Sequence, residues 1–351
     1  NWTREFGNHD FGALLYYYMQ DISNTNTVLD RTGIGNIPER YQGLSGRITY
    51  NLRKIYFLDA NFGYTGSANF ESGNQFGFFP SIAAGWVLTE YNFMRENLRW
   101  LSFLKLRYSY GLAGNDRISG QRFPYLTLIN NNAGSFWGYN GNGITKTQIG
   151  ATNLQWETSI KQDLGIEGKL LKDKIAFTID FFRDTRDNIF QRRTTIPAYA
   201  GLITMPYGNV GSMYSFGSDG NVEFFHKINK NMDFTIRANY TYAANYVTYY
   251  EEAIQPYPYQ NATGYPWGVQ RGLIALGLFK DDRDVLTSPL QTFGTYRPGD
   301  IKYKDVNGDG IINNEDRVPL SYTNNIPRLM YGVGGEFRYK NLTLSALFKG
   351  T

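Results

Sequence analysis

Ile175-Ala-Phe-Thr-Ile-Asp-Phe181 decides the fold class, because its apolar side chains recur at every second position. Successive side chains of a strand point to opposite faces of a sheet, whereas a helix needs apolar residues three or four positions apart. The stretch therefore has an apolar face and a polar face, the latter with Thr178 and Asp180. The same period of two returns at 56–64, 104–110, 234–242 and 342–348. These runs predict an all-β chain.

The composition supports this prediction and excludes several classes of protein. The 351 residues include 28 Tyr, 24 Phe, 6 Trp and 38 Gly, and aromatic residues favour strands. With no Cys, a disulfide scaffold, a zinc-finger array and an iron–sulfur site are excluded. Only His9 and His226 are available for a His-rich metal or catalytic site. A net charge of +4 is too small to indicate nucleic-acid binding.

Short and long connections between the expected strands alternate strictly along the chain. The short ones are near 51–54, 91–101, 170–174, 227–232 and 339–341, and the long ones cover 21–38, 69–77, 114–153, 188–211 and 249–325. The alternation predicts about eleven antiparallel strands in up-and-down order, with all the short turns at one end. Outer-membrane barrels have short periplasmic turns and long extracellular loops. We therefore expect a partial transmembrane β-barrel, with 249–325 as its longest extracellular loop.

The distribution of side chains favours this barrel over a soluble sandwich or propeller, in which strands also alternate. We expect Ile175, Phe177, Ile179, Phe181, Phe234, Ile236 and Tyr240 on a convex, lipid-facing side, and Thr178, Asp180, Arg237 and Asn239 in the lumen. Other inward charges are Lys105, Arg107, Lys161, Asp163, Arg183 and Glu223, which either line a channel or pair across strands. An aromatic girdle is expected at Tyr50, Tyr56, Trp86, Trp100, Tyr108, Tyr110, Trp156 and Tyr240.

One local motif has the spacing of a calcium-binding loop. In Asp305-Val-Asn-Gly-Asp-Gly-Ile-Ile-Asn-Asn-Glu-Asp316, oxygen ligands occupy positions 1, 3 and 5, Gly occupies position 6, and a carboxylate closes position 12. The expected ligands are Asp305, Asn307, Asp309, the Ile311 carbonyl and Asp316. The alternative is an Asn/Gly/Asp-rich turn that binds nothing. We expect a structural Ca²⁺ ion, and no helical pattern precedes the motif as it would in an EF-hand.

The long loops also carry aromatic residues that could contact a substrate or partner: Trp137, Tyr139, Tyr257, Tyr259 and Trp267. Aromatic rings stack on sugar faces and grip peptide side chains, but loops also use them to pack on one another. The HExxH, GxSxG and Walker motifs are absent from the sequence, so we expect neither an enzyme nor an organic cofactor. The acidic neighbours Glu251 and Glu252 are expected to be solvated.

The stretch Tyr296–Arg317, which contains the calcium-like motif, closely resembles a signature of the SusC/RagA family of TonB-dependent outer-membrane transporters. The pieces 79–86, 104–115, 153–158 and 325–332 resemble further strands of that family, in the same order and spacing. Both ends of the chain look cut, so we expect a piece of a longer polypeptide.

The resemblance implies a barrel of 22 strands, of which about half is present, and an N-terminal plug and TonB box outside this sequence. It implies import of oligosaccharides or peptides, energy from the TonB complex, and a SusD-like surface lipoprotein as a lid. It also implies an outer-membrane location in contact with lipid. Two other functions stay open: a passive porin-like channel, and a secreted β protein that binds or cleaves glycans.

Overall fold

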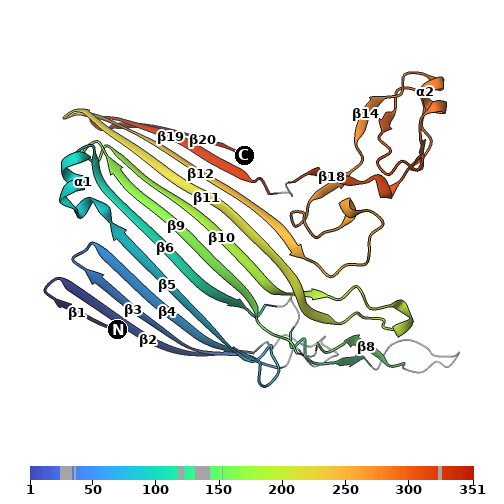
Figure 1. Ribbon diagram of the computed structural model, residues 1–351, viewed down its shortest axis with the longest axis horizontal. Helices are drawn as coiled ribbons and strands as arrows, with labels where there is room; N and C mark the ends of the chain where they lie inside the picture. Colours follow the sequence, from blue (N-terminus) through green and yellow to red (C-terminus); the bar gives the residue numbers. More distant parts are fainter. Residues whose placement is uncertain (24–33, 35–36, 118–121, 131–142, 152, 323–325) are drawn as a thin grey trace.

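Twelve strands form one antiparallel sheet in which neighbours in sequence are neighbours in space (Figure 1). The computed structural model describes residues 1–23, 34, 37–117, 122–130, 143–151, 153–322 and 326–351. The sheet consists of β1 (Trp2–Phe6), β2 (His9–Ile22), β3 (Glu39–Leu52), β4 (Tyr56–Ser67), β5 (Phe76–Val87), β6 (Leu101–Asn115), β9 (Glu157–Leu170), β10 (Ile175–Arg192), β11 (Tyr207–Asn229), β12 (Met232–Tyr249), β19 (Leu329–Tyr339) and β20 (Leu342–Gly350). The all-β, up-and-down prediction is confirmed.

The count of strands exceeds the expected eleven by one, because Trp2–Phe6 forms a strand of its own. A tight turn at Gly7 and Asn8 joins β1 to β2, and Gly7 adopts a φ of 62°. The strand has only five residues, and Arg4 and Glu5 interrupt its apolar pattern. A strand this short and charged gives too weak a period to separate it from the strand that follows.

The two ends of the sheet differ as the connection lengths predict. In Figure 1 the tight turns and the helix α1 (Asn92–Asn97) lie at one end, and the long connections lie at the other. Small elements occur within those long connections: β7 (Leu128–Asn130), β8 (Thr145–Gln148), β13 (Gln270–Gly272), β14 (Ala275–Leu278), α2 (Asp282–Thr287), β15 (Leu290–Gln291), β16 (Ile301–Tyr303), β17 (Ile311–Ile312) and β18 (Val318–Ser321). The connection between β12 and β19 is the longest and projects from the sheet.

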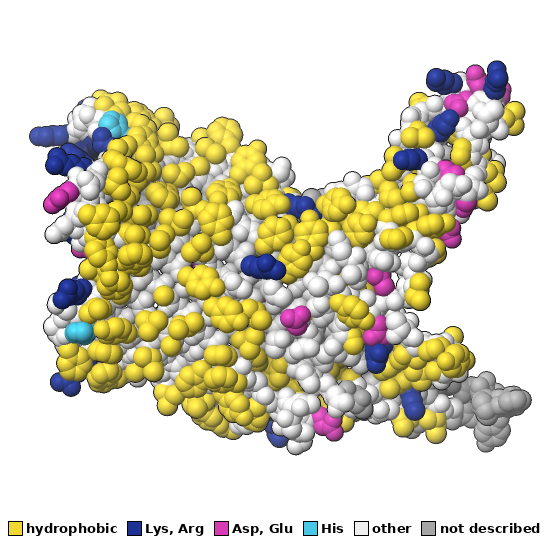
Figure 2. All heavy atoms as spheres, viewed as in Figure 1, with side chains coloured by type: hydrophobic (Ala, Val, Ile, Leu, Met, Phe, Trp, Pro, Cys, Tyr) yellow, Lys and Arg dark blue, Asp and Glu magenta, His cyan; other side chains and the backbone are white. Residues whose placement is uncertain are grey.

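The register separates the apolar and polar faces of the sheet. Residues directly opposite each other on antiparallel strands point to the same face. Ile179 lies opposite Ile166 and Gly220, and Gly220 lies opposite Tyr240, so the expected apolar residues share a face. Hydrophobic side chains spread widely over the side of the sheet seen in Figure 2.

Arg183 was expected in the lumen, and that prediction is wrong. It follows Phe181 by two positions and lies opposite Phe216, so it belongs to the apolar face. Its guanidinium carbon lies 5.4 Å from the centre of the Tyr214 ring, which gives the charge a favourable partner there. The period of two therefore outweighs the rule that charges point inward.

Several glycines lie directly opposite an aromatic residue on the next strand. Gly46 faces Phe62 and Gly168 faces Phe177. A Cβ atom on Gly46 would lie 2.3 Å from the Phe62 ring, and one on Gly168 would lie 2.4 Å from the Phe177 ring. The rings thus lie flat over the glycine backbone and cover positions that would otherwise weaken the strand.

Among the described residues, no helix is both long and apolar enough to cross a membrane.

Candidate functional site

The polar face of the sheet is a candidate lumen wall, and Arg107 on β6 is at the centre of its first ion-pair network. Its guanidinium lies 3.0 Å from a carboxylate oxygen of Glu167 and 2.6 Å from one of Asp180. Asp180 is on β10, so Arg107 reaches across the whole of β9. Gly165 makes this possible, because a Cβ atom there would lie 2.4 Å from both the Arg107 and Asp180 side chains.

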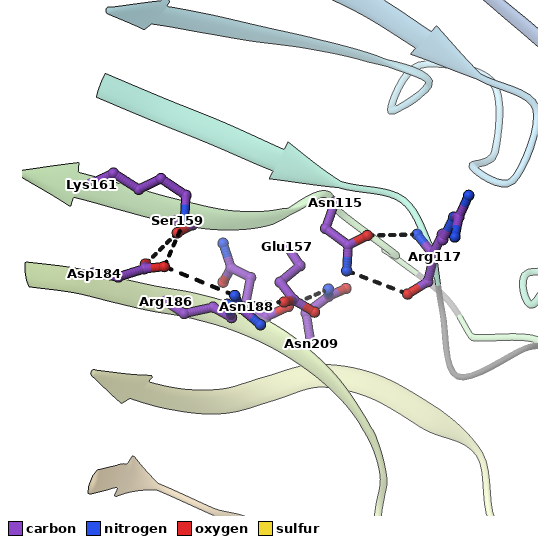
Figure 3. A network of polar contacts seen from close by, with 9 residues as sticks. All are labelled: Asn115, Arg117, Glu157, Ser159, Lys161, Asp184, Arg186, Asn188 and Asn209. Carbon is purple, nitrogen blue, oxygen red and sulfur yellow. Dashed lines mark hydrogen bonds and ion pairs between the residues drawn. The ribbon is translucent and has the colours of Figure 1, made fainter. Parts of the chain in front are cut away.

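A second network lies on the same face, closer to the long loops (Figure 3). Lys161 Nζ lies 2.8 Å from Asp184, which also accepts a hydrogen bond from the Ser159 hydroxyl. Arg186 lies 3.9 Å from Asp184 and 3.4 Å from Glu157. Figure 3 shows these side chains in a row along β9 and β10, with Asn209 reaching the carbonyl of Asn188 at one end.

Of the two roles left open for the inward charges, pairing across strands is what the structure shows for most of them. Arg237 also pairs with Glu223 at 2.8 Å, and Lys105 lies 3.9 Å from Glu167. Partly exposed pairs of this kind add little stability each. Their effect is to hold polar groups in fixed positions, so that the wall presents an ordered, hydrated and nearly neutral surface.

A small hydrophobic core closes the loop end of the sheet. Phe70, Ala151, Leu154, Trp156 and Phe190 are all buried and in contact. Trp156 packs on Phe70 with ring centres 4.9 Å apart, and its ring N–H donates to the carbonyl of Gln75 at 3.2 Å. Its placement in a lipid-facing girdle was therefore wrong, because the loop on which it lies folds back over the strand ends. This core anchors the loops from which a mouth is built.

The acidic motif of the longest loop folds as a compact turn whose carboxylates accept backbone hydrogen bonds. Asp305 accepts from the N–H groups of Gly308 and Gly310, at 2.6 and 2.8 Å. Asp316 is fully buried and accepts from the N–H groups of Val306 and Asn313, at 2.8 and 2.9 Å. The expected ligands are thus brought into one turn, and backbone amides already neutralise part of their negative charge.

Within the described part of the chain, no group of three or more His, Cys, Asp and Glu side chains is arranged to hold a metal ion. Asn307 and Asp309 instead contact each other, with the Asn307 amide donating to Asp309 at 3.0 Å. The Ile311 N–H donates to the other oxygen of Asp309 at 2.8 Å. The calcium site stays a prediction.

Tyr257 and Tyr259 fasten this turn to the preceding segment. Their rings stack with centres 5.4 Å apart and planes 2° apart. The Asn307 amide donates to the Tyr257 hydroxyl at 3.1 Å, and the Tyr259 hydroxyl donates to the carbonyl of Glu315 at 2.7 Å. Burial raises the pKa of Tyr259, and the negative charges of Asp316 and Glu315 and the neighbouring Tyr257 raise it further. Packing between loop segments is the role that the contacts show.

Of the other expected aromatic residues, the structure describes Trp267. Trp267 is 53% exposed and lies 5.7 Å from the Tyr250 ring, between ring centres. It therefore presents an accessible indole near the loop end of β12. Trp137 and Tyr139 lie outside the described residues.

Glu251 is a buried contact point between two loops, and the expectation that it is solvated was wrong. It is only 4% exposed. Arg193 donates to both of its carboxylate oxygens, at 3.1 and 3.2 Å, and the Thr195 hydroxyl donates to one of them. Burial alone would raise the pKa of Glu251, but these hydrogen bonds and the Arg193 charge lower it below the ordinary value. Arg193 is 58 positions away, so no local pattern marks the pair.

Glu252 makes a second carboxylate contact, within the longest connection itself. Its carboxylate accepts hydrogen bonds from the backbone N–H groups of Ala262 at 2.9 Å and Thr263 at 3.3 Å. Together Glu251 and Glu252 fix the start of the longest connection against the loop after β10 and against itself.

Comparison with known proteins identifies relatives along nearly the whole chain. The sequence model of the family described as "TonB dependent receptor-like, beta-barrel" matches residues 1–350. The chain is 28% identical to TonB-dependent receptor P39 of Formosa agariphila, over 94% of the chain and 34% of that receptor. It is 27% identical to TonB-dependent receptor SusC of Bacteroides thetaiotaomicron, over 86% of the chain and 30% of SusC. The chain thus spans about a third of the length of these curated relatives.

A solved structure described as that of the RagAB peptide transporter has the same fold. It superimposes with a TM-score of 0.73 and 19% sequence identity, over 99% of this chain and 39% of that one. At this identity the likeness concerns the fold alone.

Proposed function

Because the chain belongs to the TonB dependent receptor-like β-barrel family, we propose that it forms part of the wall of a transporter that imports a nutrient across the outer membrane. The family places the chain in the outer membrane. The observation that carries the proposal is the two-faced sheet, with an apolar surface toward lipid and a polar, ion-paired surface on the other side. A wall of this kind lets a polar solute pass a lipid bilayer.

We propose an oligosaccharide or a peptide as the substrate. The relatives named SusC and RagAB support this class, since RagAB is described as a peptide transporter. The ordered polar groups around Asp184 and Arg186 at the loop end also suit a solute rich in hydroxyl or amide groups. Such groups exchange hydrogen bonds with Asn, Ser and charged side chains at little cost.

Two partners belong to the same proposal: the TonB complex, which would supply energy, and a SusD-like surface lipoprotein over the mouth. The longest connection supports the second partner, because it projects from the sheet and exposes large apolar side chains (Figure 1). Leu278 is 60% exposed, Leu286 84% and Phe293 56%. An exposed apolar surface on a projecting loop is typical of a protein contact.

Uptake by the full-length protein in its native bacterium tests the proposal. A strain that lacks the gene should lose growth on one glycan or peptide mixture, and a plasmid copy should restore it. Dissipating the proton gradient should stop uptake of the labelled substrate in the complemented strain. Uptake that persists without the gradient would identify a passive channel instead, and uptake equal with and without the gene would contradict transport.

A further inference from the structure

The tight turns at one end of the sheet are rich in cations. Six basic residues and one acidic residue, Asp173, occupy four of the five tight turns, at 53–55, 171–174, 230–231 and 340–341, and the fifth, at 7–8, is uncharged. We call these six the basic rim: Arg53, Lys54, Lys172, Lys174, Lys230 and Lys340. Figure 2 shows Lys and Arg side chains along this edge of the molecule. The connection that contains α1 lies at the same end and adds two acidic and two basic residues, so it leaves the excess unchanged.

The backbone of these turns does not explain the choice of cations. Arg53, Lys54, Lys172 and Lys340 have φ values of 55°, 58°, 59° and 50°, in the left-handed region. Hairpin turns with this geometry favour Gly, Asn and Asp, because other side chains are strained there. Gly or Asn would form the same turns with less strain, so the turn geometry alone does not account for Arg53, Lys54, Lys172 and Lys340, although Leu171 and Asp173 share it.

Among the described residues, no acidic side chain neutralises the charge of the basic rim. All six side chains are exposed, and within the described residues none of them forms an ion pair. The cations of the polar wall, such as Arg107 and Lys161, are paired instead. The connection between β12 and β19, residues 250–328, has ten acidic and eight basic residues and so carries no excess of positive charge.

Exposed aromatic residues lie beside the basic rim on the apolar side of the sheet. Tyr56, Trp86 and Tyr339 lie near the ends of their strands and are 44%, 41% and 43% exposed. The Nζ atom of Lys340 lies 5.5 Å from the centre of the Tyr339 ring. Trp and Tyr at such positions sit at the level of lipid headgroups, which places the adjacent Lys and Arg side chains within reach of the phosphates.

We propose that the basic rim docks on anionic phospholipid headgroups of the leaflet at the tight-turn end of the barrel. The negatively charged phosphodiester supplies the missing counter-charge, and the aromatic residues hold the strand ends at the correct depth. Several lysines on separate turns give a charged surface that follows the circumference, rather than one binding pocket. The interaction weakens with salt, because exposed charges are screened.

The test uses the full-length transporter in nanodiscs of phosphatidylcholine that contain a small fraction of spin-labelled lipid. The measured quantity is the preference of the lipid layer around the protein for phosphatidylglycerol over phosphatidylcholine. We expect a several-fold preference in the wild type, which falls at high salt. The variant Lys54→Asn, Lys172→Asn, Lys230→Asn and Lys340→Asn should lose at least about threefold of this preference, because it removes four of the six cations that attract the headgroup phosphates.

A matched variant removes four exposed cations from the loop end: Lys146→Asn, Lys280→Asn, Arg283→Asn and Lys304→Asn. This variant changes the net charge by the same amount as the rim variant and should keep the wild-type preference for phosphatidylglycerol. Asn relieves strain in the turns, so the rim variant should stay folded, which heat-modifiable migration in electrophoresis checks. Equal preferences in the rim variant and the wild type would overturn the proposal, as would an equal loss in both variants.

Inorganic phosphate separates a lipid surface from a simple anion site. Millimolar phosphate at constant ionic strength should leave the preference for phosphatidylglycerol unchanged. Full displacement by phosphate would show a site for the free anion and overturn the lipid proposal.

Discussion

Glu251 shows how much a single buried carboxylate does in this molecule. It joins the loop after β10 to the start of the longest connection, and its partners Arg193 and Thr195 come from a distant part of the chain. The Glu251 side chain is 5% exposed and the Arg193 side chain 45%, so the carboxylate is buried while its cationic partner reaches water. Replacing the carboxylate by an amide leaves one acceptor oxygen in place of two and removes the charge that Arg193 faces.

We expect Glu251→Gln to loosen both loops by about 1–3 kcal/mol, because hydrogen bonds to a charged group are lost. Limited proteolysis of the purified transporter should show faster cleavage in 193–206. Glu71→Gln, on an exposed side chain in another loop, is the control and should leave cleavage unchanged. Unaltered cleavage in Glu251→Gln would refute the clamp.

The same clamp has a predictable response to pH. The pKa of Glu251 is lowered in the folded protein, so its contribution to stability is present above the ordinary carboxyl pKa. The contribution is lost only as the pH falls through the lowered, folded value. The protection of residues 193–206 from proteolysis should therefore be constant from neutral pH to mildly acidic pH and decline only in stronger acid. A decline at near-neutral pH would argue against this assignment.

Gly165 is the other residue on which a network depends. We expect Gly165→Ala to destabilise the sheet by about 1–3 kcal/mol, because its methyl group would displace Arg107 from Asp180. Gly63→Ala is the matched control on the same face, since no atom there lies closer than 4.0 Å. Thermal unfolding in detergent measures both variants, and equal melting temperatures would contradict the role of Gly165.

At the scale of elements, the acidic turn before β18 supports two interpretations that a pair of variants can separate. Asp305 and Asp316 cap backbone N–H groups, which an Asn side chain can also do. Calcium requires the charges as well, because hard cations prefer carboxylate ligands. We expect wild-type protein to release heat on calcium titration and to gain protection from proteases in 305–316.

Asp309→Ala should abolish the calcium heat. Asp305→Asn should keep the turn intact in the absence of calcium but bind calcium more weakly. Asp282→Ala, on the nearby helix α2, is the control. Identical heats in all four proteins would show that the motif is a turn without an ion.

At the scale of the whole molecule, the sheet has two open edges. Among the described residues, β1 pairs only with β2, and β20 pairs only with β19. Backbone N–H and C=O groups left unpaired in lipid are costly, so only closed barrels span a membrane with strands.

We therefore expect the 351 residues alone to form no heat-modifiable monomer in detergent or vesicles. Joining them to the remainder of the full-length protein should restore that behaviour. Electrophoresis of heated and unheated samples provides the measurement. A heat-modifiable monomer of the chain alone would show that β1 and β20 can close on each other.

Local sequence is enough to determine the strands, their faces and the alternation of short and long connections. The physical reason is that alternate residues of a strand point to the same face, so a period of two shows which side chains lie together, as Ile179 and Phe181 do. The period also places Arg183 on the apolar face, whereas the general rule that charges point inward placed it wrongly in the lumen. The resemblance at 296–317 identified the family from a stretch that folds as one compact loop.

Tertiary structure alone decided the contacts between distant loops. Trp156 is buried because its indole reaches a carbonyl 81 positions away, and Glu251 is buried because Arg193 lies 58 positions away. The bridge from Arg107 to Asp180 exists because Gly165 leaves room on the strand between them. Such contacts depend on how the strand ends and loops are placed in space, and periodicity carries no information about that.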